Sequence, residues 1–322
     1  MNEPTSGTMI AARIHAITYG ADGVLLFDLR AAGTHRLPAF EPGAHVDVRM
    51  PGGIHRSYSL LNDARERHRY VLGIKREAAS RGGSAWMHDS ARTGSIIEIS
   101  APRNHFELAE DAAHTILVAG GIGITPLWSM VQRLQWLGRR WTLYYRARSR
   151  TTAPLLHELA LPSISAHVKL SFSEQVSSER LDLQRVVAEA PAGAHFYCCG
   201  PAPMMQAFEK ACATIDPARV HVEYFASTEL PATQGGFVVH LARAGRDVPV
   251  APGQTILESL RACGIAVPSS CQQGVCGECE VKVLAGAPDH RDLVLSAAER
   301  ASGRTMMICC SGALSQELTL DI

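Results

Sequence analysis

Hydrophobic and polar residues alternate along short segments in the first third of the chain. The clearest of these segments are 45–50 (HVDVRM), 69–76 (RYVLGIKR) and 95–100 (SIIEIS). A period of two predicts strands that bury one face, and paired Pro and Gly residues between the segments predict tight turns. Residues 1–110 are therefore predicted to form an antiparallel barrel or sandwich.

The pattern changes over residues 114–225, where continuous apolar runs alternate with segments of helical period. The apolar runs are 116–120, 141–146, 168–173, 196–200 and 220–225. The helical segments are 126–138, 181–190 and 203–215. Because strands buried on both faces alternate with helices here, the sequence predicts a parallel sheet covered by helices on both sides.

A third pattern follows the polar stretch 227–235, whose composition is typical of a linker. Beyond it, 237–243 and 317–322 have the composition of strands. Thr255 and Glu258 are spaced as a capping box that opens a helix. Three domains are therefore predicted, and their boundaries are 1–110, 111–226 and 236–322, with a linker at 227–235.

Composition narrows the function only by exclusion. The chain holds 31 Lys and Arg against 31 Asp and Glu, so its overall charge does not favour nucleic acid or an anionic membrane as a partner. No apolar stretch is long enough to span a bilayer, and the N-terminus lacks the pattern of a secretory signal. We therefore expect a cytoplasmic protein.

Cysteine carries the strongest chemical signal. Nine cysteines occur, and five of them lie between positions 271 and 310. An odd number clustered in this way suits metal-bound thiolates in a reducing compartment better than disulfides. Cys271, Cys276 and Cys279 have the C-x4-C-x2-C spacing of plant-type [2Fe–2S] sites, in which a fourth Cys is distant in sequence. Gly274 and Gly277 would let the loop turn backbone N–H groups toward the sulfurs.

Two alternatives remain open at the cysteine site. One is structural zinc, although zinc ligands usually come in paired motifs at shorter separations. The other concerns the fourth ligand, because Cys309 and Cys310 are adjacent and the alternation of a strand would point only one of them inward.

Two turns in the second region indicate a nucleotide site. The first apolar run ends in a Gly-rich turn that contains Gly120, Gly121 and Gly123. Such a turn lets the backbone approach a pyrophosphate at a helix N-terminus, although an ordinary strand–helix turn would also explain it. A later strand ends in Cys199, Gly200 and Pro201. In a doubly wound sheet both turns lie at the carboxyl ends of strands, so together they predict a nicotinamide-dinucleotide site.

The first region contains a cation, an aromatic ring and two hydroxyls on one alternating segment: Arg56, Ser57, Tyr58 and Ser59. Further along, a basic residue precedes two glycines and a hydroxyl at the start of a short helical segment: Lys75, Gly82, Gly83 and Ser84. Taken alone, the first segment is an ordinary strand. Two glycines, a hydroxyl and basic groups at a helix N-terminus predict a phosphate cradle.

In this order, the motifs resemble the ferredoxin–NADP reductase superfamily, and within it the group of phthalate dioxygenase reductases and vanillate O-demethylase reductases. The matching stretches are 56–60 (RSYSL), 73–77 (GIKRE), 81–84 (RGGS), 120–126 (GGIGITP), 198–205 (CCGPAPMM), 222–225 (VEYF) and the cluster cysteines. The resemblance covers essentially the whole chain. It implies a multidomain protein with an antiparallel β-barrel that binds FMN, an α/β parallel-sheet nicotinamide domain and a C-terminal β-grasp [2Fe–2S] ferredoxin domain.

The resemblance also implies residue roles. The FMN contacts would be Arg56, Ser57, Tyr58, Ser59, Gly73, Lys75, Gly82, Gly83 and Ser84. The nicotinamide dinucleotide would contact Gly120, Gly121, Gly123, Thr125, Arg148, Ser149, Cys199, Gly200 and Pro201, and Phe225 would cover the flavin ring. The residues nearest the transferred hydride would be Ser59, Thr125, Cys199 and Phe225. The cluster ligands would be Cys271, Cys276, Cys279 and Cys309, because the group places the last one two residues before the Ser of its strand.

The function that the resemblance implies is a reductase that passes electrons from NADH through FMN to the cluster, and then to a Rieske-type terminal oxygenase acting on aromatic compounds. NADPH is the alternative donor, since Arg146, Arg148 and Arg150 form a basic cluster after a strand. Gly312 stands where the group commonly has a basic residue, which leaves the partner less certain than the cluster. A flavin reductase or diaphorase and a non-catalytic zinc-binding interaction protein remain as other classes.

Overall fold

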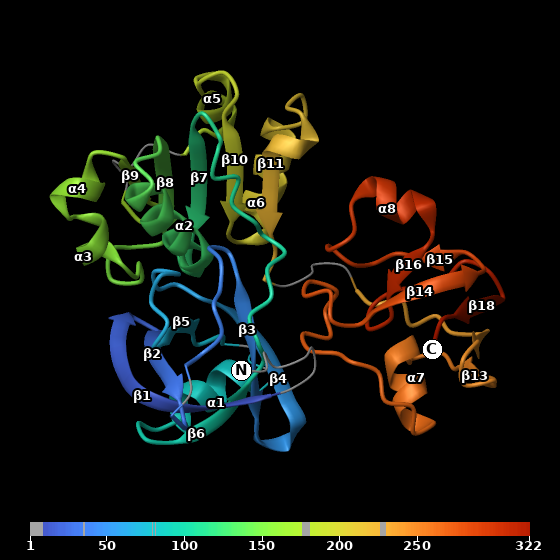
Figure 1. Ribbon diagram of the computed structural model, residues 1–322. Helices are drawn as coiled ribbons and strands as arrows, with labels where there is room; N and C mark the ends of the chain where they lie inside the picture. The colour runs from blue at the N-terminus through green and yellow to red at the C-terminus, as the bar shows by residue number, and fades with distance from the viewer. Residues whose placement is uncertain (1–8, 35, 79, 81, 176–180, 226–229) are drawn as a thin grey trace. The chain divides into compact units, whose positions relative to one another are not determined.

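The computed structural model describes residues 9–34, 36–78, 80, 82–175, 181–225 and 230–322 (Figure 1). The chain divides into two compact units, Met1–Glu223 and Tyr224–Ile322. The first unit contains a barrel and a parallel sheet, and the second contains the cysteine cluster. Among the described residues, no helix is both long enough and apolar enough to cross a bilayer.

The N-terminal part of the first unit is an antiparallel barrel, as the alternating segments predict. Its strands are β1 (Ile10–Ala21), β2 (Val24–Ala31), β3 (His45–Met50), β4 (Ile54–Ser59), β5 (Tyr70–Lys75) and β6 (Ile96–Ile99), with the 3-10 turn η1 (Pro51–Gly53) and helix α1 (Gly83–Asp89) between them. The strand order is β4-β3-β6-β1-β2-β5, and an antiparallel bridge from Leu60 to Leu72 joins the two outer strands. Residues of alternating strand positions, including Phe27, Val46 and Leu72, form one buried core.

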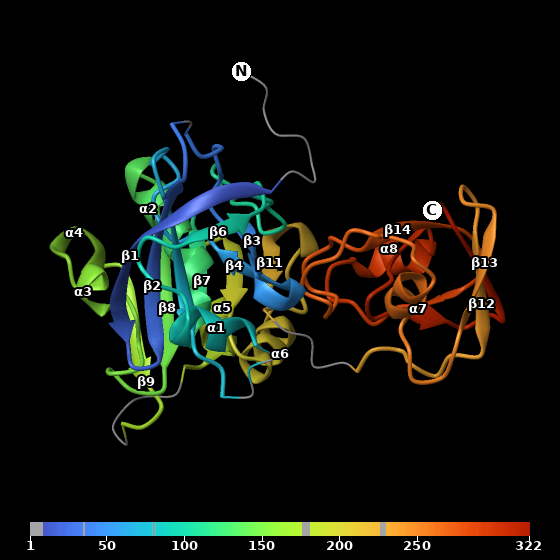
Figure 2. The same cartoon turned by 90° about the horizontal axis from the view of Figure 1, so that it is seen from below.

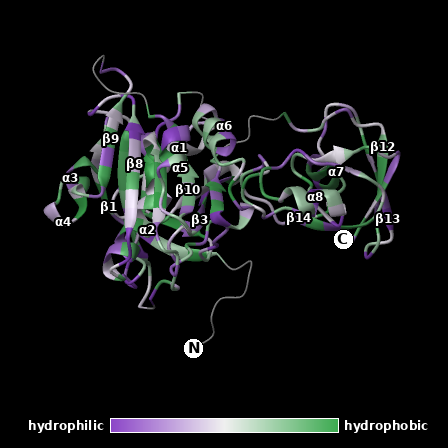
Figure 3. Ribbon diagram, turned by 90° about the horizontal axis from the view of Figure 1, so that it is seen from above, coloured by the Kyte–Doolittle hydropathy of each residue, from purple (hydrophilic) through white to green (hydrophobic). Residues whose placement is uncertain are grey.

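The second part of the first unit is a sheet of five strands, all of them parallel. The strands are β7 (Thr115–Gly120), β8 (Trp141–Ala147), β9 (Val168–Phe172), β10 (His195–Cys199) and β11 (Val220–Glu223). The helical segments are η2 (Gly121–Gly123), α2 (Ile124–Trp136), α3 (Leu156–Leu159), α4 (Pro162–Ser165), α5 (Leu183–Ala188), α6 (Ala202–Ala211) and η3 (Pro217–Arg219). In Figure 3 the hydropathy of the labelled strands β8, β9 and β10 can be followed by colour. The parallel pairing of all five strands confirms the predicted α/β parallel sheet.

The strand order β11-β10-β7-β8-β9 reverses direction at β7. Because crossovers between parallel strands are right-handed, a reversal puts the helices of the two halves on opposite faces. Figure 2 shows this arrangement, with α2 on one face of the sheet and α5 and α6 on the other. The reversal point lies between β7 and β10, and it is where ligands bind in doubly wound sheets.

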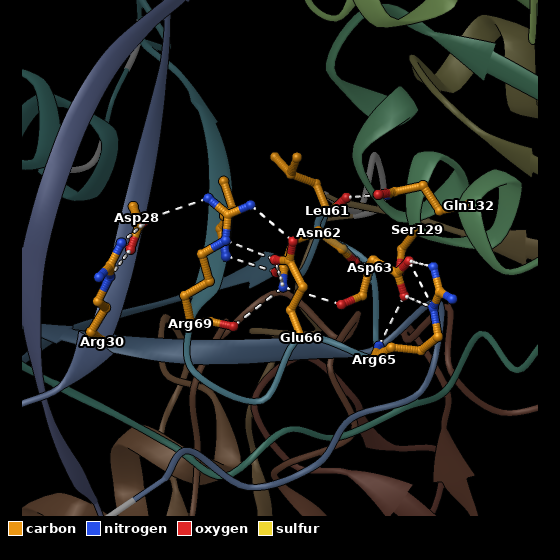
Figure 4. A network of polar contacts seen from close by, with 11 residues as sticks. Asp28, Arg30, Leu61, Asn62, Asp63, Arg65, Glu66, Arg69, Ser129 and Gln132 are labelled. Carbon is orange, nitrogen blue, oxygen red and sulfur yellow. Dashed lines mark hydrogen bonds and ion pairs between the residues drawn. The ribbon is translucent and has the colours of Figure 1, made fainter. Parts of the chain in front are cut away.

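The loop after β4 joins the barrel to α2 through a polar network (Figure 4). Ser129 donates a hydrogen bond to the carbonyl of Asn62 at 3.1 Å, and the amide of Gln132 donates to the carbonyl of Leu61 at 2.9 Å. The side-chain oxygen of Asn62 accepts the N–H of Val71 in β5. These bonds use backbone groups that would otherwise be buried without partners, so the barrel and the sheet pack as one unit.

The C-terminal unit has a mixed sheet with short helices packed against it. Its elements are β12 (Phe237–Leu241), β13 (Arg246–Val250), α7 (Ile256–Ala262), β14 (Glu280–Ala285), β15 (Pro288–Asp289), α8 (Ala297–Ser302), β16 (Thr305–Met307), β17 (Gly312–Ala313) and β18 (Glu317–Leu320). The strand order is β13-β12-β18-β14-β16, and β15 pairs with β17 separately. The hairpin β12–β13, the parallel pair β12–β18 and α7 make the β-grasp arrangement that was predicted. Thr255 and Glu258 form the predicted capping box at the start of α7.

The polar stretch before β12 is more closely tied to the C-terminal unit than its composition predicts. Positions 226–229 lie outside the described residues. Ala232 is buried, and its N–H donates to the carbonyl of Cys310 at 2.7 Å. The carbonyl of Thr233 accepts the N–H of Gly253. Residues 232–235 of the predicted linker therefore pack on the fold that follows them.

Candidate functional site

Two turns meet where the parallel sheet reverses direction. Strands β7 and β10 are neighbours, and Ala119 pairs with Cys199 at their carboxyl ends. A Cβ on Gly120 would lie 2.5 Å from the Pro201 ring and 3.1 Å from the Cα of Gly200. A Cβ on Gly123 would lie 2.2 Å from the carbonyl oxygen of Cys199. Side chains are therefore excluded because the two turns touch each other.

Gly121 differs from the other glycines of this turn. It has a φ of +54°, and a Cβ added there would meet nothing within 4 Å. Its positive φ favours glycine for conformational reasons alone. Gly121 thus leaves a bare, open stretch of backbone at the head of the 17-residue segment 120–136, where an anionic group could approach. In this motif, Gly120 and Gly123 are required because the neighbouring turn is close, whereas Gly121 is required because its φ is positive.

Thr125 joins this turn to the barrel. Its side chain is buried, and its hydroxyl donates to the carbonyl of Ile122 at 3.0 Å. Its methyl group lies against Gly73 of β5, where a Cβ would come within 2.8 Å. Gly73 and Thr125 are therefore brought together, as a contact between the barrel and the sheet. Both were predicted as cofactor contacts, and that role stays a prediction.

Glu223 is a candidate that the sequence did not single out, although it lies within the VEYF motif. Strand β11 places it beside Cys199 of β10, and Ser59 of the barrel donates to its carboxylate at 3.4 Å. Burial raises the pKa of the Glu223 carboxyl to about 8, against the opposing effect of the hydrogen bond from Ser59. Burial, with a contribution from the charge of Glu223, also raises the pKa of the Cys199 thiol. Three elements thus bring together a hydroxyl, a thiol and a carboxyl that hold their protons.

Arg56 and the glycine pair 82–83 form one arrangement. A Cβ on Gly83 would lie 2.5 Å from Cγ of Arg56, so the arginine side chain runs directly over the backbone at the start of α1. A Cβ on Gly82, which has a φ of +92°, would lie 2.7 Å from Ile54. The sequence-distant motifs RSYS and GGS therefore meet, and the phosphate cradle stays a prediction.

The remaining predicted flavin residues have protein partners. Ser57 donates to the buried Asp47 at 2.6 Å. Ser84 accepts the N–H of Glu77 and donates to Ser80, which closes the loop before α1. Tyr58 packs partly against the barrel core, and burial raises the pKa of its phenol to about 12. These side chains shape the site, whereas contact with a cofactor stays a prediction for each of them.

Two predicted cofactor residues lie on the surface. Lys75 forms an exposed ion pair with Glu77 at 3.1 Å. Phe225 belongs to the second unit and is 41% exposed. A flavin ring over that phenyl group is therefore a prediction that rests on the resemblance.

The basic cluster after β8 contains an acid that the sequence reading overlooked. Arg148 pairs with Glu174 at 2.5 Å, and the N–H of Glu174 donates to the carbonyl of Arg148. Ser149 is part of a turn with Thr151 and Thr152. Arg150 lies over the Phe172 ring at 5.3 Å. Glu174 therefore places a carboxylate beside Arg148 at the ends of β8 and β9, where a dinucleotide ribose would bind.

The four predicted cluster cysteines are all buried and free of disulfides. The Cys271 thiol is in hydrogen-bond contact with the side chains of Cys276 and Cys309. Backbone N–H groups point at the sulfurs, since Gln273 donates to Cys271 at 3.3 Å and Cys271 donates to Cys276 at 3.5 Å. Gly274 and Gly277 have φ values of +69° and +77°. The donor set and its N–H groups therefore fit a [2Fe–2S] cluster.

The thiols of Cys309 and Cys310 contact each other, but their other neighbours differ. Cys309 contacts Cys271 of the loop, whereas the Cys310 thiol lies 3.7 Å from the carbonyl of Met307. A Cβ on Gly274 would lie 2.4 Å from the Cys310 sulfur, so Cys310 supports the loop from behind. Within the described ranges, no three Cys, His, Asp or Glu side chains converge as the ligands of a single metal ion would.

Family models match two parts of the chain. Residues 117–210 match the oxidoreductase NAD-binding domain, and residues 239–314 match the 2Fe-2S iron-sulfur cluster binding domain. The first match covers the Gly-rich turn and the end of β10, and the second covers all of the predicted cluster ligands. Oxidoreductase chemistry with a nicotinamide and an iron–sulfur domain is thereby confirmed.

Whole-chain relatives agree with these matches. The chain is 66% identical to phenoxybenzoate dioxygenase subunit beta of Ectopseudomonas oleovorans over 97% of each chain. It is 45% identical to tetrachlorobenzoquinone reductase of Sphingobium chlorophenolicum over the full length of both. The solved structure of phthalate dioxygenase reductase covers 98% of each chain at 37% identity with a TM-score of 0.76. That protein is described as a modular structure for electron transfer from pyridine nucleotides to [2Fe–2S]. The chain therefore belongs to the phthalate dioxygenase reductase family of flavin and iron–sulfur electron-transfer reductases.

Proposed function

We propose that this chain is the reductase component of a two-component oxygenase system, and that it moves electrons from NADH through FMN and a [2Fe–2S] cluster to a Rieske-type terminal oxygenase. The observation that carries the proposal is the presence, in one chain, of a buried four-cysteine set with N–H groups on its sulfurs and a Gly-lined dinucleotide edge. The name of the 66% identical relative, a dioxygenase subunit, supports the oxygenase as partner. This chain would act in the cytoplasm.

For the flavin, we propose that the phosphate lies in the cradle of Arg56, Lys75, Gly82, Gly83 and Ser84. The guanidinium of Arg56 lies over the bare backbone of Gly83, so a charged group and N–H groups converge. Gly73, Ser57, Tyr58 and Ser59 would border the ring, with Phe225 as its cover. When bound, FMN accepts a hydride from NADH and releases electrons singly, and the cluster carries one electron at a time.

For the nicotinamide dinucleotide, we propose that the pyrophosphate lies on Gly120, Gly121 and Gly123, with Thr125, Gly200 and Pro201 shaping the site. Arg148 and Ser149 would lie near the adenosine ribose. The carboxylate of Glu174 holds Arg148 in an ion pair and would repel a 2′-phosphate, so it favours NADH over NADPH. The 2′-hydroxyl of NADH would instead donate a hydrogen bond to the carboxylate of Glu174.

For hydride transfer, we propose that Ser59, Cys199 and Glu223 position the reacting rings and exclude water. The hydroxyl of Ser59 is oriented by its hydrogen bond to Glu223. Because burial keeps the Cys199 thiol and the Glu223 carboxyl protonated, neither group brings a full negative charge to the hydride path at neutral pH. The chain thus supplies positioning in a polar but uncharged setting.

For the cluster, we propose the ligands Cys271, Cys276, Cys279 and Cys309. The domains would be 1–110 for the flavin, 111–226 for the nicotinamide and 236–322 for the cluster, with residues 232–235 of the linker 227–235 packed on the last one. The name of the 45% identical quinone reductase favours one further acceptor, a quinone, as a second candidate. The two candidates differ only in what receives the electron.

The test is the visible spectrum of the purified protein during anaerobic addition of NADH, and of NADPH in a second sample. We expect flavin and iron–sulfur bands that bleach together, faster with NADH. A colourless protein, or flavin bands that bleach while the iron–sulfur bands are absent, would overturn the proposal. Reoxidation by a Rieske oxygenase or by a benzoquinone then separates the two acceptors.

The pKa of Glu223 predicts how stability depends on pH. A carboxyl whose pKa rises to about 8 on folding holds a proton that the unfolded chain releases near pH 4.5. The folded state therefore binds more protons between these values, and its stability falls as pH rises from about 5 to about 8. Glu223→Gln should reduce this fall, measured as the difference in melting temperature between the two proteins at pH 5.5 and 8. An equal fall in both proteins would show that Glu223 is not the group responsible.

A further inference from the structure

A buried carboxylate lies behind the cluster loop, in the segment between β15 and α8. Asp292 is fully buried, and its Oδ2 accepts the N–H groups of Val294 at 3.1 Å and Leu295 at 2.8 Å. Its other oxygen, Oδ1, has no hydrogen-bond partner among the described residues. Such a group is costly to bury unless a function or a partner retains it.

Asp292 packs directly on the loop that joins Cys271 to Cys276. The N–H of Leu293 donates to the carbonyl of Gly274 at 2.8 Å. A Cβ on Gly274 would lie 2.9 Å from the Cα of Asp292, so the two backbones are in contact. Only the thickness of the loop therefore separates the carboxylate from the side on which the sulfurs are held.

The basic side chains around Asp292 do not hydrogen-bond its free oxygen. The ring of His290 is nine-tenths buried, and its Nδ1 lies 3.7 Å from Oδ1. Neither ring nitrogen of His290 has a hydrogen-bond partner among the described residues. Arg300 donates to the backbone carbonyl of Asp292, and Arg291 pairs with Asp289. The negative charge on Oδ1 is thus only partly balanced within the protein.

We propose that Asp292 is a positioning residue that lowers the reduction potential of the [2Fe–2S] cluster through its buried charge. Reduction adds one negative charge to the cluster, and a fixed anion behind the loop opposes that addition. Net charge and hydrogen bonds near the sulfurs are the means by which proteins set cluster potentials. The carboxylate also fixes the turn 293–295, and through Leu293 it holds Gly274 in place. This inference rests on the proposed function, because it requires the cluster.

The test is a potentiometric titration of the full-length chain carrying its cofactors, with dye mediators, read by the electron paramagnetic resonance signal of the reduced cluster. Asp292→Asn keeps an oxygen for the N–H groups of Val294 and Leu295 and removes the charge. We expect the ratio of reduced to oxidised cluster at a fixed potential to rise about tenfold, which is 59 mV for one electron. The shape of the signal should not change, because no ligand changes.

Asp247→Asn is the matched control. Asp247 also faces a histidine, His240, in the same unit, but its side chain is 68% exposed. Solvent screens its charge, so we expect less than about a twofold change. Asp292→Ser provides a second uncharged variant, and Asp292→Glu should restore a low potential.

An unchanged potential in Asp292→Asn or Asp292→Ser would overturn the proposal. Loss of the cluster in both variants would also overturn it, because Asp292 would then hold the loop together and not tune the cluster. Failure of the proposed function has a different signature. In that case the unmodified chain itself would give no reduced iron–sulfur signal.

Discussion

Replacing Cys276 by Ser is expected to abolish reduction of a protein acceptor such as cytochrome c, while NADH oxidation by a small dye continues. Cys276 lies in the loop, receives the N–H of Cys271 on its sulfur and contacts the Cys271 thiol. Serine keeps the size but binds iron poorly, because soft thiolates are the preferred ligands of iron–sulfur clusters. Electrons would then reach the flavin and stop there. We expect at least about a 100-fold loss in cytochrome c reduction.

Two further cysteine variants separate the ligand role from a general need for thiols. Cys263 is exposed and lies at the end of α7, outside the loop, so Cys263→Ser should behave as the unmodified protein. Cys309→Ser should behave as Cys276→Ser, whereas Cys310→Ser should keep the iron–sulfur bands. If Cys310→Ser lost the iron–sulfur bands and Cys309→Ser kept them, Cys310 would be the fourth ligand. Normal cytochrome c reduction by Cys276→Ser would contradict the proposed electron path.

Gly123→Ala is expected to lower kcat/KM for NADH by about 100-fold or more, since misplacement by about 1 Å at a reacting site has that effect. The added methyl group would lie 2.2 Å from the carbonyl oxygen of Cys199 and 2.8 Å from the backbone nitrogen of Gly200, which leaves it no room. The turn after β7 and the end of β10 would have to separate. Steady-state kinetics with NADH measures the loss, and chemical reduction of the same protein by dithionite checks that the cluster is intact.

Gly121→Ala is the control in the same turn. Nothing lies within 4 Å of its added methyl group, so only the positive φ is penalised, by about 1–2 kcal/mol. Its kcat/KM should fall much less than that of Gly123→Ala. Equal losses in the two variants would mean that backbone conformation, and not the contact between turns, decides binding.

Local pattern predicted most of the fold because each element carries its own signal. Alternation along HVDVRM predicted β3, and Thr255 with Glu258 predicted the start of α7. The Gly-rich turn predicted a nucleotide site, and the structure adds a second reason for two of its glycines. Gly120 and Gly123 are required by the neighbouring turn of β10, a contact between segments 75 residues or more apart that no local pattern contains.

The residues that the sequence reading missed owe their roles to neighbours far away in the chain. Glu223 is one acid in a strand, and only the pairing of β11 with β10 brings it beside Cys199 and Ser59. Glu174 is a candidate because it forms an ion pair with Arg148 at the end of the adjacent strand. Asp292 is a candidate because its backbone contacts Gly274 of the cluster loop. A carboxylate has no periodic signature, so burial and partners must be seen before such a residue can be assigned.

The contact between Ala232 and Gly312 couples two parts of the chain that would otherwise vary independently. A Cβ on Gly312 would lie 2.7 Å from the Cβ of Ala232, so only one of these positions can carry a larger side chain. In related proteins, a basic residue at position 312 should therefore covary with a displaced or smaller residue at 232. The same contact sets where the ferredoxin unit can be excised or fused to another enzyme. A cut placed at Gly236 would remove Ala232, whose N–H donates to the carbonyl of Cys310, so a transplanted unit needs the residues from 230 onward.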